Sequence, residues 1–356
     1  MKIIESDVKF LKQGEGLQGL YEHIENCGRT CYKSEDNIKE GSAEKFVNAM
    51  IKSHHGAMLE HGTVYLSVPY DTKRDYQING YSIYSADHVI PRIGAQYAAN
   101  PFSKVNTNPE KQTFEITTNY RVIVENGWID DLQYMCEPSE YHEKRYTLRF
   151  VCDRGVTHEL VRHRKFSFAQ ESSRYCNYGS DKKFGKELTF ISPSWCNYEE
   201  IKDMADVIQN SRKEVQNAVY DLTMADVYDN NETQAFTVKK DDNLLELSKE
   251  ESIEIANQKR CELMMVYDMM RSEKIYMYLM EHGYQPQQAR QVLPTMIKSE
   301  ICMTGFASDW RFFFDLRLYG KTGAPHPDML MVAKIAQKQF IINDAWNDII
   351  GCESKF

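Results

Sequence analysis

The chain has 356 residues, of which 42% are hydrophobic and 27% charged, and its formal net charge is −9. This composition excludes a disordered chain, because it can bury a large core, and no apolar run is long enough to cross a membrane. The first ten residues alternate charged and apolar side chains where a secretory signal is apolar, so we expect a cytoplasmic protein.

The N-terminal part of the chain is predicted to be helical over about residues 15–55. It contains FVNAMIKSHHGAMLEH, in which Phe46, Met50 and Ile51 recur at helical spacing. Gly56 is expected to stop this helix.

Two strands are predicted at 63–68 (TVYLSV) and 146–152 (YTLRFVC), where apolar and polar residues alternate. The residues between them, about 69–145, are rich in Tyr, Asn and Pro and are interpreted as an insertion with a further strand at 118–125 (TNYRVIVE). A helix is predicted through THELVRHR, which would place Arg162 near its C-terminal half.

The C-terminal half is predicted to be mainly helical. A second insertion, about 200–255, is acidic and expected to be solvent-facing, and a helix over about 252–282 is expected to end at Gly283. Pro286 then begins another helix. The methionines of the long helix are expected in the core. Residues 1–356 are predicted to form a single domain with the two insertions.

The cysteines show no pattern of ligands or bridges. Their number is nine, no CxxC pair occurs, and only Cys27 and Cys31 lie close together in the sequence. We therefore expect neither a disulfide framework nor a zinc site, and no metal.

The stretch RHRKFSFAQESSRY, residues 162–175, concentrates cations in this acidic chain. A polynucleotide, a small phosphorylated ligand or a solvated helix face could explain it. Nucleic-acid binding needs many phosphate contacts over a broad basic surface, whereas the flanking residues here are acidic. A short cationic segment suits a mononucleotide or a cofactor phosphate better. The sequence contains no GxGxxG, GxxxxGK[ST], HExxH or GxSxG, which leaves the common nucleotide-binding loops, zinc proteases and serine hydrolases without support.

The basic segment also carries a more specific pattern. The triplet RHR at residues 162–164 is followed, after seven residues, by Ser172, and this RHR(x)7S pattern resembles the signature of flavin-dependent thymidylate synthases. Four further stretches resemble segments of that family in order and spacing: GRTCY, SHHGAMLEH, QARQVLP and FFFDLR. The resemblance covers about residues 25–320.

The resemblance implies a reductive methylation of dUMP to dTMP, with 5,10-methylenetetrahydrofolate as carbon donor, FAD as hydride carrier and NADPH as reductant. It also implies the family's α+β fold, a mainly antiparallel central sheet flanked by helices, and a homotetramer with active sites between subunits. The partners are then dUMP and folate, and neither nucleic acid nor a membrane is expected. The classical thymidylate synthases use a cysteine nucleophile, usually after proline, and no Pro-Cys dipeptide occurs here.

The resemblance also assigns site residues. Arg317, in FFFDLR, is the expected catalytic group, since a guanidinium can stabilise charge developing on the uracil carbonyl oxygens without exchanging a proton. The expected cofactor contacts are His55, Glu60, Arg162, His163, Arg164 and Gln170. The expected nucleotide contacts are Glu159, Arg162, Gln170, Glu171, Ser172, Ser173, Arg174, Arg290 and Arg317.

The chain departs from the family pattern at several positions. Gln170 stands where the family usually has Glu, and Glu159 where it often has Gln. The family's Asn-x-Arg before the reactive arginine, which helps to hold FAD, is replaced by Phe306, Ala307 and Ser308. Flavin contacts at this point are therefore expected to differ.

Two other functions stay open from the sequence. One is a nucleic-acid-binding protein that uses the 162–174 segment, with Tyr and Phe as stacking platforms. The other is a non-catalytic relative that binds dUMP or flavin without turnover. Arg311 is expected to pack on its neighbouring phenylalanines or to pair with Asp309 or Asp315, and His326 is expected in a turn.

Overall fold

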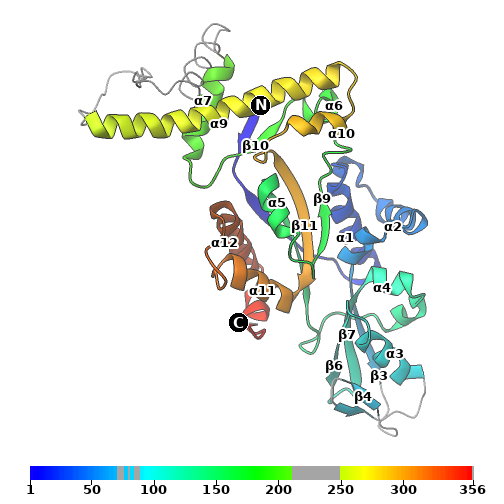
Figure 1. The fold of residues 1–356 in the computed structure, drawn as a ribbon. Helices are drawn as coiled ribbons and strands as arrows, with labels where there is room; N and C mark the ends of the chain where they lie inside the picture. The colour runs from blue at the N-terminus through cyan, green and yellow to red at the C-terminus, as the bar shows by residue number, and fades with distance from the viewer. Residues whose placement is uncertain (70–75, 79–80, 84–88, 211–248, 355–356) are drawn as a thin grey trace. The chain divides into compact units, whose positions relative to one another are not determined.

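The computed structural model describes residues 1–69, 76–78, 81–83, 89–210 and 249–354. Helices and mainly antiparallel sheets occur together (Figure 1), which confirms the predicted α+β class. The chain packs as two compact units. The small unit consists of Met1–Ser6, Asp153–Gly155 and Ser173–Lys298, and the large unit of Asp7–Cys152, Val156–Ser172 and Ser299–Phe356.

A four-stranded sheet forms the centre of the large unit. Its strand order is β2 (Asp7–Leu11), β8 (Arg145–Asp153), β11 (Lys298–Phe306) and β9 (Ser167–Gln170). β2 runs antiparallel to β8, and β9 runs antiparallel to β11. The strand predicted at 146–152 is therefore confirmed.

Helices cover both faces of this sheet, α1 (Gly16–Thr30) on one face and α11 (Ala307–Arg317) with α12 (Pro327–Ile342) on the other (Figure 1). Alternate residues of β11 point to opposite faces, so Cys302 packs in the cluster that contains α1, while Ile301 and Met303 pack with α11 and α12. Each large apolar side chain buried in these layers contributes about 1.5–3 kcal/mol. A short helix, α13 (Trp346–Ile350), follows α12.

The first insertion adds a second sheet to the large unit. Its antiparallel strands are β3 (Thr63–Pro69), β7 (Thr113–Asn119) and β6 (Lys104–Asn108). Its other elements are β4 (Tyr76–Ile78), β5 (Tyr81–Ile83), α3 (Val89–Ala98), α4 (Tyr120–Glu125) and η3 (Ile129–Tyr134). β3 confirms the strand predicted at 63–68.

The strand predicted at 118–125 is wrong over most of its length. β7 ends at Asn119, and the residues after it form α4. Oδ1 of Asn119 accepts a hydrogen bond from the Val122 amide at 3.2 Å, which caps the helix and outweighs the β preference of its valines.

The helical region predicted at 15–55 consists of several shorter elements. After α1 come η1 (Glu35–Asn37), α2 (Ser42–Lys52) and η2 (Gly56–His61). The prediction that Gly56 stops the helix is wrong, because α2 ends at Lys52 and Gly56 begins η2. A Cβ at Gly56 would lie 2.8 Å from Oε1 of Glu125, so this flexible side chain would have to shift to make room for a larger residue.

The helix predicted through THELVRHR ends earlier than expected. α5 spans Arg154–Leu160, and the chain then reverses into β9 through a turn closed by the bonds His163 N to Leu160 O and Phe166 N to His163 O, both 3.0 Å. This turn leaves Arg162 exposed and His163 buried. The basic triplet is therefore a turn, because the edge strand β9 has to return along β11.

The small unit combines a two-stranded parallel sheet with helices. Its elements are β1 (Lys2–Ile4), α6 (Asp181–Phe184), β10 (Thr189–Ile191), α7 (Tyr198–Asn210), α9 (Lys249–Glu281), α10 (Pro286–Ala289) and η4 (Arg290–Val292). Met269 and Met270 of α9 are buried, as predicted, whereas Met264, Met265, Met277 and Met280 are partly exposed. Gly283 has a φ of 85° after the helix end. The solvent-facing stretch predicted at 200–255 lies largely outside the described residues. Among the described helices, none combines the length and the low polarity that a membrane span requires.

Candidate active site

The candidate site of the large unit centres on Arg317, the last residue of α11. Its Nη1 donates to Oε2 of Glu159 at 2.8 Å, and its Nε donates to Nε2 of His163 at 3.1 Å. We call these three residues the Arg317 cluster. The chain reversal after α5 brings Glu159 and His163 next to α11. The Arg317 and Glu159 side chains keep 20% and 30% of their surface exposed, so a ligand can reach both.

His163 forms the buried side of the Arg317 cluster. Its ring makes edge contacts with Phe166, Phe312 and Phe313 at centroid distances of 6.2, 6.4 and 5.2 Å. Burial, and then the charge of Arg317, lowers the pKa of His163 to about 4. The ring is therefore neutral at pH 7, and because Nε2 accepts from Arg317, Nδ1 carries the proton. In this position His163 orients the guanidinium.

The other cations of the basic turn point into solvent. Arg162 and Arg164 are exposed, and within the described part of the chain neither has an ion-pair partner. Lys165 lies 4.0 Å from Oδ1 of Asp309. Exposed, uncompensated guanidiniums suit a diphosphate, whose oxygens they bind in pairs. Arg162 and Arg164 are therefore accessible to an anionic ligand.

Gln170 and Glu171 take part in the packing of the sheet. Nε2 of Gln170 donates to Oγ1 of Thr157 at 2.8 Å and to Oγ of Ser299 at 3.2 Å. Oε2 of Glu171 accepts from the Glu300 amide at 3.2 Å, and only 1% of Glu171 is exposed. The structure therefore places the Glu171 carboxylate among protein groups, whereas Gln170 remains partly exposed.

Ser172 lies beside another stretch that carries the family resemblance. Its amide donates to the carbonyl oxygen of Cys31 at 2.9 Å, directly after α1. The fold thus joins the end of RHR(x)7S to the GRTCY segment, about 140 residues earlier in the chain.

His55 and Glu60 lie at the two ends of a short surface segment. His55 is exposed just before η2, and Oε1 of Glu60 pairs with Nη1 of Arg121 at 2.6 Å. Arg121 also pairs with Glu125 at 2.8 Å. The sequence prediction missed Arg121, although its spacing of four residues from Glu125 is typical of a helical ion pair.

The residues that replace the family's Asn-x-Arg begin α11. The amide and hydroxyl of Ser308 donate to Oε1 of Glu143 at 3.2 and 2.5 Å, so Glu143 caps the helix. Lys104 Nζ lies 5.6 Å and Arg145 Cζ 5.3 Å from the ring centroid of Phe306. Two cations from distant parts of the sequence therefore surround this segment, and no motif pointed to them.

Two further predicted residues lie together in the small unit. Nε of Arg174 donates to Oε1 of Gln287 at 3.2 Å, and Nη1 of Arg290 donates to Oγ of Ser173 at 3.4 Å. Because Arg174 directly follows Ser173, these bonds bring both guanidiniums to one surface region. Arg174 is exposed and Arg290 is partly exposed, as a phosphate-binding pair has to be.

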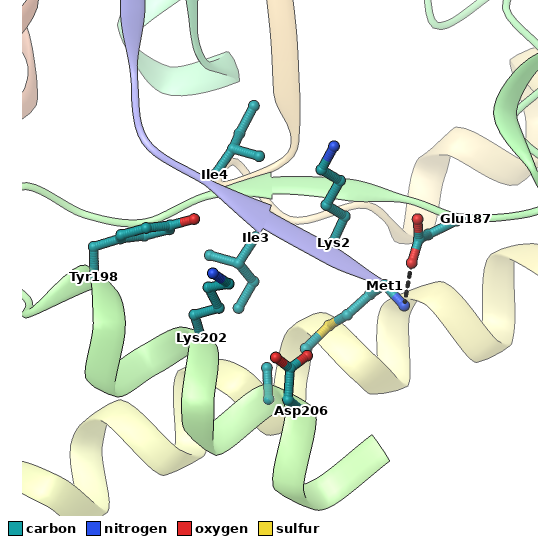
Figure 2. Close-up of a pocket in the computed structure, with 9 residues that line it drawn as sticks. Met1, Lys2, Ile3, Ile4, Glu187, Tyr198, Lys202 and Asp206 are labelled. Atoms are coloured by element: carbon teal, nitrogen blue, oxygen red, sulfur yellow. Dashed lines mark ion pairs between the residues drawn. The ribbon is translucent and has the colours of Figure 1, made fainter. Parts of the chain in front are cut away.

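A pocket of about 320 Å³ lies between β1 and α7 of the small unit (Figure 2). It is lined by Met1, Lys2, Ile3, Ile4, Glu187, Tyr198, Lys202, Ala205 and Asp206. The site residues expected from the sequence are not among them. The pocket contains two lysines and two acidic side chains, one of which, Glu187, pairs with the Met1 amino group at 3.4 Å.

The chain therefore exposes guanidiniums at two positions, one on the basic turn of the large unit and one beside Ser173 in the small unit, and exposed guanidiniums are suited to binding anions. The family described as thymidylate synthase complementing protein matches residues 95–340, which is more than half of the chain. The chain belongs to this family, and the family predicted from the motifs is confirmed.

Solved structures similar to this chain include the UMP/dUMP methylase PolB from Streptomyces cacaoi bound with 5-Br dUMP. The two are 12% identical with a TM-score of 0.38, and the match covers 99% of this chain and 98% of that chain. The same methylase bound with 5-Br UMP is also 12% identical, with a TM-score of 0.37 and coverage of 99% and 96%. No curated protein matches the chain.

Proposed function

We propose that this protein catalyses the FAD-dependent reductive methylation of dUMP to dTMP, with 5,10-methylenetetrahydrofolate as carbon donor and NADPH as reductant. Membership of the thymidylate synthase complementing protein family supports the proposal. The observation that carries it is the Arg317 cluster, in which a partly exposed guanidinium is held by Glu159 and His163.

The Arg317 cluster has the chemistry that uracil activation needs. Addition of a nucleophile at C6 places negative charge on a uracil carbonyl oxygen, and a fixed guanidinium stabilises this charge. His163 remains neutral and accepts from Nε, so it orients Arg317 without adding a second positive charge. Glu159 supplies an acceptor next to the Arg317 donors. The Glu159 acceptor is complementary to the N3–H group of uracil, and an Arg317 donor is complementary to the adjacent carbonyl group.

FAD, when bound, supplies the hydride transfer. We propose that Arg162 and Arg164 hold its phosphates and that His55 and Gln170 contribute polar contacts, since these residues are exposed or partly exposed. Lys104, with 47% of its side chain exposed, is proposed to replace the cation that the family carries near the start of α11.

The nucleotide phosphate is assigned to Arg174 and Arg290, together with the hydroxyl of Ser173. Two guanidiniums and a neighbouring hydroxyl provide the charge and the donors that a monophosphate requires. We further propose a cytoplasmic homotetramer with active sites between subunits, which light scattering and sedimentation would test.

One assay tests the proposal directly. Purified protein should show flavin absorption, and it should convert dUMP to dTMP with methylenetetrahydrofolate only when NADPH is present. Flavin and dUMP binding without turnover would instead support a non-catalytic relative. Colourless protein that binds DNA with strong salt dependence would support the nucleic-acid-binding alternative.

A further inference from the structure

A largely buried group of potential ligands, of which only Cys136 is partly exposed, lies in the first insertion, apart from the residues assigned above. It consists of Glu115 on β7, Cys136 just after η3 and His142 in the segment before β8, and we call it the Glu115 cluster. All three belong to the large unit. Glu115 and His142 are only 2% and 4% exposed.

The spacing of the three ligand atoms suits a tetrahedral ion. Nε2 of His142 lies 3.2 Å from Oε2 of Glu115 and 4.0 Å from Sγ of Cys136, and the three atoms lie within 4.8 Å of one another. Zinc bonds of about 2.0–2.3 Å at tetrahedral angles place ligand atoms roughly 3.3–3.8 Å apart. The 4.0 Å distance from Sγ of Cys136 to Nε2 of His142 is slightly longer than this range, and a small movement of Cys136 towards His142 would bring it within the range.

Neighbouring hydroxyls orient the Glu115 carboxylate. Its Oε1 accepts from Oγ of Ser67 at 2.9 Å and from Oγ1 of Thr113 at 2.5 Å. Oε2 is therefore the oxygen that faces His142. Outer hydrogen bonds that fix one carboxylate oxygen and aim the other are typical of metal sites.

Without a metal, the His142 ring makes two hydrogen bonds that a bound ion would have to displace. The Ser139 amide donates to Nδ1 of His142 at 3.0 Å, so Nε2 carries the ring proton and donates to the Leu66 carbonyl at 3.2 Å. Burial raises the pKa of the Cys136 thiol to about 11. Metal binding releases the thiol proton to solvent and moves the ring proton to Nδ1, where Oγ of Ser139, 3.0 Å away, can accept it.

We propose that Glu115, Cys136 and His142 bind one divalent zinc-class ion, with water as the fourth ligand. Thiolate and imidazole ligands favour zinc over magnesium or calcium. The ion would tie β7 to the segment between η3 and β8, and it would thereby brace the insertion. Loss of the hydrogen bonds that join His142 to the Ser139 amide and the Leu66 carbonyl, and release of the thiol proton, oppose binding, so a moderate affinity is expected.

Cobalt titration of the full-length protein tests the site without nucleotide or flavin, and so independently of the proposed function. Cobalt should bind with a thiolate-to-metal charge-transfer band that saturates at one equivalent and is removed by zinc. Cys136→Ser should abolish the band. Cys261→Ser is the matched control, because Cys261 is an exposed thiol of the small unit, and it should leave the band unchanged.

Two further measurements keep the test decisive if Cys136→Ser fails to fold. Ser139→Ala removes the acceptor for the relocated ring proton, together with the bond that its Oγ accepts from the Tyr141 amide at 3.3 Å, and should weaken cobalt affinity about tenfold or more. In the wild type, zinc should slow alkylation of Cys136 but not of Cys261, as read by mass spectrometry. A missing thiolate band, a band that survives in Cys136→Ser, or alkylation of Cys136 that ignores zinc would overturn the proposal.

Discussion

The Arg317 cluster and the Glu115 cluster both combine a histidine and a carboxylate with a third polar group, yet they differ in access. Arg317 and Glu159 are 20% and 30% exposed, whereas Glu115 and His142 expose almost nothing. A charged pair at the surface can exchange a protein partner for a ligand at little cost, while a buried carboxylate has to keep its hydrogen bonds. The first cluster is therefore suited to a substrate and the second to a structural role.

The largest expected effect is on catalysis by the exposed cluster. Arg317→Lys keeps the charge but loses the planar fork that bonds both Glu159 and His163. We expect the variant to retain FAD and its reduction by NADPH, but to form dTMP about 10²–10³-fold more slowly, or about 3–4 kcal/mol in barrier. Single-turnover reoxidation with dUMP and methylenetetrahydrofolate measures this step.

Arg311→Lys is the matched control for that experiment. Arg311 lies on the same helix and pairs with Asp315 at 3.5 Å, away from the Arg317 cluster. The Arg311→Lys variant should form dTMP at a near-normal rate. Near-normal dTMP formation by Arg317→Lys would show that uracil is activated elsewhere.

The contrast in burial is tested by removing the carboxylate from each cluster. Glu115→Ala leaves the Ser67 and Thr113 hydroxyls without their acceptor and opens a cavity, so it should lower the free energy of unfolding by about 2–4 kcal/mol. Glu159→Ala removes a partly exposed ion pair and should cost less than about 1 kcal/mol. Urea unfolding of both variants gives the comparison, and equal losses would contradict it.

The phosphate assignment predicts an effect on affinity. Arg174→Ala and Arg290→Ala should each weaken dUMP binding by about 1.5–3 kcal/mol, the range for hydrogen bonds to charged groups. Lys183→Ala, on α6 of the same unit, serves as a charge-matched control. Calorimetry measures all three, and unchanged affinity in both arginine variants would remove them from the site.

Acid should weaken the fold through His163. Its folded pKa of about 4 lies below the ordinary value of 6.5, so the unfolded state binds more protons in acid. This contribution to stability is complete above pH 6.5 and is lost as the pH falls towards 4. It should amount to about 2 kcal/mol between pH 6.5 and 5. His163→Gln should reduce this pH dependence in urea unfolding, and an identical pH profile for the variant would count against a buried neutral histidine.

The smallest effect is expected at Ser172, whose backbone is fixed by Cys31. We expect its hydroxyl to donate a hydrogen bond to the nucleotide, so Ser172→Ala should lose less than about tenfold in turnover, near 1 kcal/mol. Complete loss of dTMP formation with dUMP binding and FAD content intact would point to covalent catalysis by this serine.

Sequence patterns determined those features that depend on near neighbours. Alternation predicted β3 and the core of β8, and helical periodicity with Gly283 predicted α9 and its end. The motifs also identified the family and the arginine at the end of α11. Each of these signals is carried by residues within a few turns or a few strand positions of one another.

Tertiary structure decided the features in which distant segments compete with local preference. The capping of α4 by Asn119 replaced a predicted strand, and the return of β9 along β11 converted the RHR helix into a turn. Glu159 and Arg317 are 158 residues apart, and Glu115, Cys136 and His142 follow no ligand spacing. Burial and partner choice at such positions depend on which segments the fold packs together, and a single sequence carries no local pattern for that.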